Sequence, residues 1–268
     1  MNPLFLNTIL LGGSTADKLV ACHGAGFDQI ELWQQDLAAA SGDASALKQQ
    51  LDALPLALTD YQVLLDFDGA PDSIRAAKRA EAITMLDTAV KLGATTLLTP
   101  GCTRPDCVAE RIDEDMGWLA DEAASRGLRI AYEGMAWSTV NFTLPAAWAL
   151  VQRLSRPNIG VVVDAFHIFV RGRDASDLDG IPMDRIFLVQ LSDLDHGVDL
   201  AHVIDTARHH RLLPGQGHFP ISTILTRLQR DHYEGPVGLE VFNDELKARE
   251  PHLVARQAMA ALKSVWPG

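Results

Sequence analysis

The feature that most constrains the fold is an alternation of short apolar runs with helix-like segments along the whole chain. Eight runs have the continuous apolar character of parallel strands covered on both faces, and they span residues 4–10, 29–33, 56–61, 95–99, 128–133, 159–164, 186–191 and 237–242. Alternating strands and helices indicate right-handed βαβ units, and eight strands in about 250 residues favour a closed (β/α)8 TIM barrel. A doubly wound open sheet is the alternative, but no G-x-G-x-x-G follows the first run.

The segments between these runs complete the expected barrel. Apolar residues recur with helical spacing at residues 72–92, 145–154, 221–228 and 253–265. Two longer segments, 64–72 and 192–217, follow the third and seventh runs, at the expected C-terminal face where barrel enzymes place their active sites. Because no Pro-, Gly- or Ser-rich linker interrupts the alternation, we expect one α/β domain over residues 1–268.

The composition narrows the class of partner. The chain carries 23 basic and 35 acidic residues, which give a formal charge of −12. This balance argues against nucleic acid, whose phosphates need clustered Lys and Arg, and against anionic membrane surfaces. No apolar run approaches the roughly 20 residues of a membrane-spanning helix, and the start lacks the basic region of a signal peptide. Since Cys22, Cys102 and Cys107 make no disulfide framework, we expect a cytoplasmic protein.

Four polar residues lie at the ends of the last four apolar runs: Glu133, Asp164, Gln190 and Glu240. A lone carboxylate at a strand end is more often a loop cap or a salt-bridge partner. Residues on four adjacent strands would instead converge near the barrel axis, where their charges repel one another unless a cation or shared protons neutralise them. Four oxygen donors predict one divalent metal ion, with Mg²⁺ or Mn²⁺ favoured and Co²⁺ or Zn²⁺ as alternatives.

A histidine and an aromatic residue are expected beside this metal site. His167 follows Asp164 by three residues, so we expect it on the loop above the ion, as a proton-transfer residue rather than a ligand. A histidine at a helix N-terminus is the structural alternative. Trp137 is expected to line the substrate pocket, although aromatic residues at a barrel rim usually serve packing.

Charged residues elsewhere suggest how a substrate would be bound. Glu31, at the end of the second run, is expected to face the substrate or to support the metal site, with a structural salt bridge as the alternative. Arg208 and Arg211 lie just before Pro214-Gly215-Gln216-Gly217. Such a basic cluster in an acidic protein suits an anionic group of the substrate, although most charged clusters are solvated surface.

These strand-end residues resemble the xylose-isomerase-like TIM-barrel superfamily, which contains sugar isomerases and epimerases, inosose dehydratases and endonuclease IV. Within it the chain is most similar to bacterial 3-dehydroshikimate dehydratases, in the stretches AGFDQIELWQQDL, RIAYEGMAW, PNIGVVVDAFH, IFLVQLSD, R-x-x-PGQG and GLEVFNDELKA. The resemblance implies that Glu133, Asp164, Gln190 and Glu240 bind the metal. It also implies that His167 is the active-site histidine and that Arg211 lies near the substrate carboxylate.

Two positions depart from the dehydratase pattern. Leu65 stands where an Arg is expected before the D-F-E-G loop, which here reads Asp66-Phe67-Asp68-Gly69. A His is expected shortly after Ala136-Trp137, where this chain has Ser138-Thr139-Val140. Both departures concern the substrate rather than the metal.

The resemblance and the residues together predict a divalent-metal-dependent lyase that dehydrates 3-dehydroshikimate to protocatechuate, with His167, Glu133 and Glu240 as catalytic residues. An isomerase or epimerase of a keto-sugar or inositol derivative is the alternative, because both reactions begin by removing a proton beside a carbonyl. A DNA-repair endonuclease and a non-catalytic sugar-binding barrel are weaker alternatives. We expect a small polyhydroxylated substrate, with or without a carboxylate, and leave the oligomeric state open.

Overall fold

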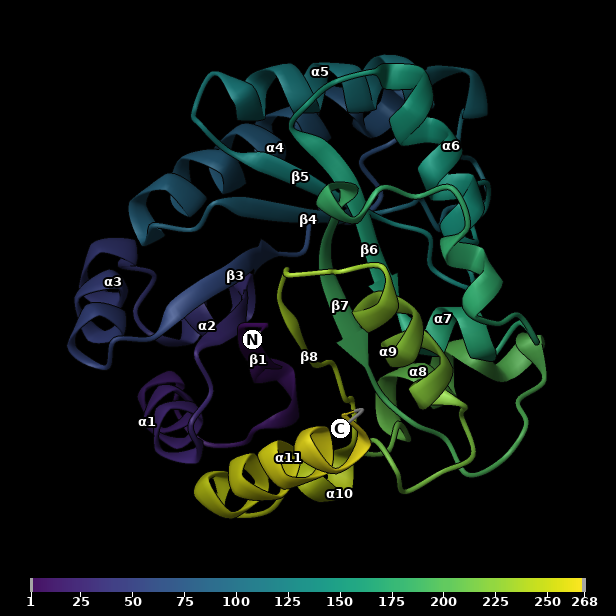
Figure 1. Cartoon of the computed structure of the whole chain (residues 1–268). Helices are drawn as coiled ribbons and strands as arrows, with labels where there is room; N and C mark the ends of the chain where they lie inside the picture. The colour runs from purple at the N-terminus through teal and green to yellow at the C-terminus, as the bar shows by residue number, and fades with distance from the viewer. Residues whose placement is uncertain (1, 267–268) are drawn as a thin grey trace.

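The computed structural model describes residues 2–266, in which eight parallel strands close into a barrel in the order β1 to β8 (Figure 1). The strands are β1 (Leu4–Asn7), β2 (Gln29–Trp33), β3 (Ala57–Gln62), β4 (Thr96–Pro100), β5 (Arg129–Glu133), β6 (Ile159–Asp164), β7 (Ile186–Leu191) and β8 (Val237–Leu239). Each strand pairs with its sequence neighbours, and β8 pairs with β1 to close the circle. The predicted (β/α)8 TIM barrel is confirmed.

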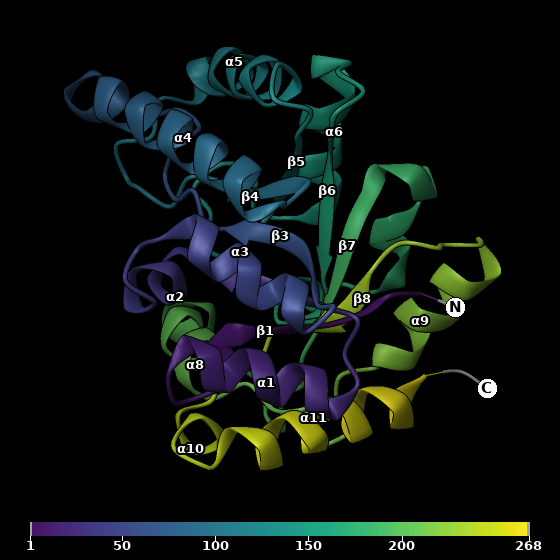
Figure 2. The same cartoon turned by 90° about the vertical axis from the view of Figure 1, so that its left-hand side faces the viewer.

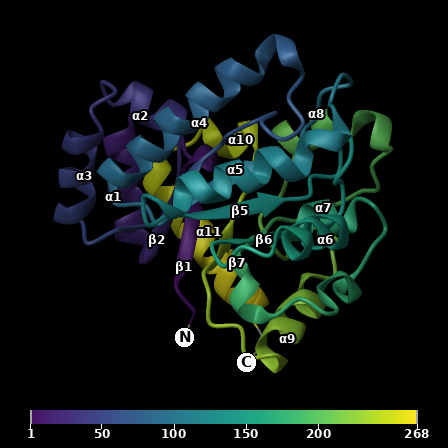
Figure 3. The same cartoon turned by 90° about the horizontal axis from the view of Figure 1, so that it is seen from above.

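Helices surround the barrel. They are α1 (Thr15–Ala25), α2 (Gln34–Ala39), α3 (Ala44–Ala53), α4 (Asp72–Leu92), α5 (Ile112–Ala124), α6 (Leu144–Leu154), α7 (Ala165–Phe169), α8 (Val203–His209), α9 (Ile221–Arg230), α10 (Asp244–Lys247) and α11 (Pro251–Val265). Figure 2 shows α11 beside α1, and these two helices pack on each other. Figure 3 shows α2 and α3 on one side of the barrel and α6 and α7 on the opposite side. No helix within residues 2–266 is both long and apolar enough to cross a bilayer.

Local sequence signals explain where the long helices begin and end. Helix α4 has the predicted bounds, and it ends at Gly93, whose φ of 76° is a left-handed conformation that glycine adopts without steric cost. Helix α11 begins with Pro251 in its first turn, and the side chain of Glu250 accepts hydrogen bonds from the backbone N–H groups that follow.

Two strands are each three residues shorter than predicted. The run 4–10 leaves the sheet after Asn7, because the Asn7 side chain caps a 3₁₀ helix at Thr8–Leu10 by accepting the N–H of Ile9 at 3.0 Å. Strand β8 ends at Leu239, so Glu240 lies just beyond the strand instead of within it. The long segment 192–217 is partly helical, since it contains α8.

The interior of the barrel is divided into two levels. One level is an apolar cluster inside the strands, composed of Phe5, Val63, Leu98, Ala131, Val162, Phe187 and Leu188. A Cβ at Gly238 would collide with the backbone oxygen and the ring of Phe5, so glycine at this position leaves room for that ring. The polar residues of the candidate site lie further along the strands, toward their C-terminal ends. The apolar cluster therefore closes the barrel below the site.

Candidate metal centre and active site

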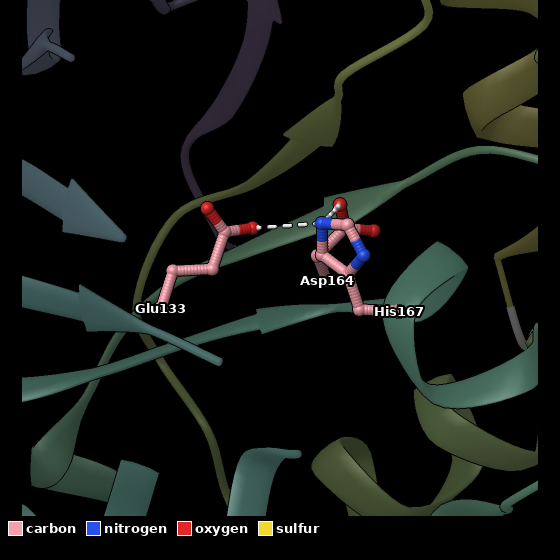
Figure 4. A group of neighbouring side chains, drawn as sticks. All are labelled: Glu133, Asp164 and His167. Atoms are coloured by element: carbon pink, nitrogen blue, oxygen red, sulfur yellow. Dashed lines mark ion pairs between the residues drawn. The ribbon is translucent and has the colours of Figure 1, made fainter. Parts of the chain in front are cut away.

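Two carboxylates and one imidazole converge at the C-terminal ends of β5 and β6. Glu133 ends β5, Asp164 ends β6, and His167 lies on the short helix α7 that follows (Figure 4). One potential ligand atom from each lies within 4.8 Å of the others. Nε2 of His167 is 3.4 Å from Oε1 of Glu133 and 3.4 Å from Oδ2 of Asp164. All three residues are buried.

The backbone fixes the tautomer of His167. The N–H of Ala136 donates to Nδ1 of His167 at 3.1 Å, so a neutral ring carries its proton on Nε2. Burial is the main cause that lowers the pKa of His167 to about 4, which keeps the ring neutral near pH 7. The ring is also held edge-on by Trp137, with 4.9 Å between the ring centroids. In this state Nε2 is a hydrogen-bond donor facing the carboxylates and has no lone pair for a cation.

Arg211 ties together the carboxylates of two strands. Its Nη1 lies 3.1 Å from Oδ2 of Asp164 and 3.1 Å from Oε2 of Glu240, while its Nε donates to the carbonyl of Ala207 at 2.9 Å. The guanidinium stacks 4.3 Å from the ring centroid of Phe166, and the residue is only 2% exposed. Arg211 is therefore part of the site itself, since Asp164 and Glu240 share its charge.

We call Glu133, Asp164 and Glu240 the site carboxylates. Burial, followed by the charges of Glu240 and Asp164, raises the pKa of Glu133 well above its usual range. Burial likewise raises the pKa of Glu240 to about 7, although Arg211 opposes this rise. Three carboxylates with one guanidinium carry a formal charge of −2, which one divalent cation would neutralise.

Unpaired buried oxygens show that the site suits such a cation. The amide of Gln190 donates from Nε2 to Oε1 of Glu31 at 2.8 Å, while its own Oε1 has no partner among the described residues. Oε1 of Glu133 is likewise unpaired within residues 2–266. Buried acceptors without a donor are rare, and oxygen atoms of this kind are the ligands that Mg²⁺ and Mn²⁺ prefer. The donor set therefore fits a hard divalent ion.

A cavity of about 510 Å³ opens above these residues. Its wall includes Glu133, His167, Arg211 and Glu240 from the site, together with Trp137, Leu65, Arg208 and Lys247 further out. Asp164, Gln190 and Glu31 do not line it and are 3%, 0% and 0% exposed. The cavity thus places a small molecule against part of the candidate metal site and against the cationic side chains at its mouth.

Residues 19–265 match the family described as xylose isomerase-like TIM barrel. The chain belongs to this family. A 3-dehydroshikimate dehydratase of Pseudomonas putida is 31% identical over 257 residues, which are 95% of this chain and 40% of that protein. The chain thus spans about two fifths of the length of that relative.

Two further proteins align along nearly their whole length with this xylose isomerase-like barrel. An inosose isomerase of Bacillus velezensis is 26% identical over 96% of this chain and 95% of its own. The crystal structure titled IOLI protein with a binding zinc atom superposes with a TM-score of 0.87 at 23% identity, covering 98% of this chain and 97% of that one. This last likeness shows the fold.

The two departures from the dehydratase pattern lie in different places in this xylose isomerase-like barrel. Leu65 is 37% exposed and lines the cavity. Ser138 is buried, and its hydroxyl donates to the carbonyl of Gly101 at 2.9 Å. Of these two positions, Leu65 is therefore the one that borders the cavity.

Two site residues in this family member were not among the sequence candidates. Asn7 donates to both Glu31 and Glu240 at 3.1 Å. Asp60 pairs in register with Glu31 across β2 and β3 and is fully buried, which raises its pKa well above the usual range. Both interrupt an apolar run with a polar side chain, the same signal that identified Glu133 and Asp164.

Proposed function

We propose that this chain is a divalent-metal-dependent lyase that dehydrates 3-dehydroshikimate to protocatechuate. The observation that carries the metal dependence is the cluster of Glu133 and Asp164, to which Arg211 joins Glu240, with the unpaired oxygens of Gln190 and Glu133. Similarity to a 3-dehydroshikimate dehydratase over 95% of the chain supports the substrate.

The proposed cation is bound by Glu133, Asp164, Gln190 and Glu240. Because all four donors are oxygens, we favour Mg²⁺ or Mn²⁺, with Co²⁺ and Zn²⁺ as alternatives, and the solved relative with bound zinc supports a divalent ion in general. A bound divalent ion would supply Lewis-acid stabilisation of the charge that develops on the substrate carbonyl.

The substrate loses a proton from the carbon beside its carbonyl and a hydroxyl from the next carbon, which leave together as water, and the ring then tautomerises to the aromatic product. Glu133 is the candidate base, because it lines the cavity while its buried Oε1 remains available to the cation. Both oxygens of Glu240 are already bonded, to Asn7 and to Arg211, so Glu240 holds the site together. Glu133 then passes the proton to the departing hydroxyl.

His167 would act through its Nε2–H. Because Nδ1 accepts the N–H of Ala136, the imidazole offers a donor to a substrate oxygen instead of a lone pair to a carbon-bound proton. Trp137 packs against the ring and lines the cavity, so it positions His167 and contacts the substrate.

Cationic side chains at the cavity wall suit the carboxylate of this substrate. Arg208 is exposed, lines the cavity and makes no ion pair with any carboxylate in residues 2–266. Arg211 contributes less, because its Nη1 and Nε are bonded, although no partner is found for its Nη2 among the described residues. We propose Arg208 as the main carboxylate contact, with Arg211 behind it.

A second candidate is an isomerase or epimerase of an inosose or keto-sugar. Alignment with an inosose isomerase along 95% of its own length favours it, as does Leu65, an apolar residue in the cavity wall. Both reactions would use the same base and the same cation, so the substrate decides between them.

The test is to load the protein with Mn²⁺, supply 3-dehydroshikimate or an inosose, and follow aromatic ultraviolet absorbance together with the sugar products. Growth of the aromatic absorbance that is lost on chelation and in Glu133→Gln supports the dehydratase, with the exposed Glu110→Gln as a matched control. Isomerised inosose without aromatic product would favour the second candidate. Turnover of neither substrate would refute both.

The proposed partner is this small polyhydroxylated molecule alone, and the location that we propose is the cytoplasm. Cys22, Cys102 and Cys107 are all free thiols in the structure, which suits a reducing compartment.

A further inference from the structure

The side-chain amide of Gln190 has a defined orientation. The residue is fully buried, its Nε2 donates to Oε1 of Glu31 at 2.8 Å, and its carbonyl oxygen is left unpaired among the described residues. The two ends of an amide are nearly the same size, so only their partners decide which end faces the candidate metal centre. At Gln190 that partner is Glu31.

Glu31 is in turn held by Asn7. Nδ2 of Asn7 donates to Oε2 of Glu31 and to Oε1 of Glu240, each at 3.1 Å. Oδ1 of Asn7 accepts the indole N–H of Trp33 at 2.8 Å and the backbone N–H of Ile9 at 3.0 Å. With both ends of its amide bonded to partners of opposite kind, Asn7 cannot turn over without breaking these hydrogen bonds.

We propose that Glu31, held by Asn7, is a positioning residue that makes Gln190 an oxygen donor to the cation. This inference rests on the proposed metal centre. Glu31 is fully buried and does not line the cavity, so it cannot touch a substrate there, and its hydrogen bonds to Gln190 and Asn7 connect it to the site. With the carbonyl of Gln190 turned inward the proposed ligands are all oxygen, which suits Mg²⁺ or Mn²⁺; with the NH₂ turned inward a donor would face the cation.

Glu31→Gln should reverse this orientation. The new side chain has one oxygen and one NH₂ where Glu31 has two acceptors. Asn7 is fixed by its other hydrogen bonds and keeps its Nδ2 on the remaining oxygen, so the new NH₂ faces Gln190. Gln190 can accept that N–H only by turning its amide, which aims its own NH₂ at the cation.

A second substitution should restore the ligand. In Glu31→Gln/Gln190→Glu the new NH₂ at position 31 donates to a carboxylate at position 190, and Asn7 still donates to the oxygen at position 31. The hydrogen bond between positions 31 and 190 is thus reversed in direction, and the one from Asn7 is kept. The side chain at position 190 then presents an oxygen to the cation again. Gln190→Glu alone removes the amide N–H that Glu31 accepts and sets two carboxyl groups against each other.

The experiment is calorimetric titration of the metal-free wild type, both single variants and the double variant with Mn²⁺. Glu31→Gln should bind Mn²⁺ about 10–100-fold more weakly than the wild type. Gln190→Glu adds a negative charge and should strengthen Mn²⁺ binding in both backgrounds, but the gain should be larger in the Glu31→Gln background, where the substitution also returns an oxygen to the cation. An added negative charge alone would give the same gain in both backgrounds, so a larger gain in the Glu31→Gln background separates orientation from charge.

Equal Mn²⁺ affinity of Glu31→Gln and wild type, or a gain from Gln190→Glu that is the same in both backgrounds, would overturn the inference. Thermal melting of each metal-free variant checks that it is folded. If Glu31→Gln does not fold, Asn7→Ser gives the second test, because it removes the hydrogen bond from Asn7 to Glu31 and keeps Glu31 itself. An unchanged Mn²⁺ affinity of Asn7→Ser would also overturn the proposal. A wild type that binds no Mn²⁺ would overturn this inference and the metal centre together, whereas Mn²⁺ binding without turnover would refute only the proposed reaction.

Discussion

Replacing Arg211 by Met should leave two buried carboxylates without their cation. Nη1 of Arg211 is 3.1 Å from both Asp164 and Glu240, and all three side chains are less than a tenth exposed. Removing one partner of a buried ion pair costs about 3–5 kcal/mol, because the remaining charge stays desolvated. Met is an unbranched side chain without charge, so the guanidinium contacts with the two carboxylates and with the ring of Phe166 are lost together.

The expected shift in melting temperature follows from the size of the chain. An unfolding entropy of about 2.1 cal/mol/K per residue over 268 residues gives about 0.56 kcal/mol/K, so the metal-free variant should melt about 5–9 °C below the wild type. Mn²⁺ supplies positive charge to the same carboxylates. It should therefore raise the melting temperature of Arg211→Met more than that of the wild type.

Differential scanning calorimetry of both proteins, with and without Mn²⁺, measures these shifts. Arg153→Met is the matched control, because Arg153 pairs with Asp113 at 2.8 Å with both side chains about half exposed. Such a surface pair contributes about 0–1 kcal/mol, which is less than about 2 °C here. The charge argument is wrong if the melting temperature of Arg211→Met is as close to that of the wild type as the control's is. It is also wrong if Mn²⁺ raises the melting temperatures of Arg211→Met and the wild type equally.

Two further predictions concern His167 and Asp68. His167→Ala should lower kcat by about 10²–10³-fold and leave the Mn²⁺ stoichiometry unchanged, because the variant loses a hydrogen-bond donor to the developing charge but keeps every proposed metal ligand. A reduced metal content in this variant would contradict the prediction. Asp68 is buried and accepts the hydroxyl of Tyr132 at 2.6 Å, and burial raises its pKa from 3.8 to about 7. The native state thus holds a proton that the unfolded chain releases, so the free energy of unfolding should fall as pH rises from about 4 to 7, by at most about 4 kcal/mol. Asp68→Asn should lack this fall, and urea titrations at pH 5 and 8 that give both proteins the same pH dependence would contradict it.

The strands could be predicted because parallel strands buried on both faces appear as unbroken apolar runs. Their ends were harder to place. The run 4–10 stays apolar through Leu10, but the side chain of Asn7 caps a 3₁₀ turn and ends β1 early. A local hydrogen bond of this kind competes with the strand ladder and leaves no trace in hydropathy.

The candidate site was predictable where a polar residue ended a run, as at Glu133 and Asp164. Asn7 is also a polar residue in an apolar run, but it lies inside the predicted strand 4–10 and not at its end, so the pattern does not predict it as a site residue. The pairing of Arg211 with Asp164 joins residues 47 positions apart, and it depends on how α8 is placed over the barrel. Local patterns do not contain such information.

Within residues 2–266, the apolar cluster around Phe5 fills the barrel below the candidate site. A small molecule would reach the candidate site past Leu65 and Arg208, which line the cavity and are exposed. Under the proposed reaction, entry and departure would alternate, and each product molecule would leave past the side chains that admitted its substrate. Those rim residues therefore govern the rate of exchange with solvent as well as the choice of what is exchanged.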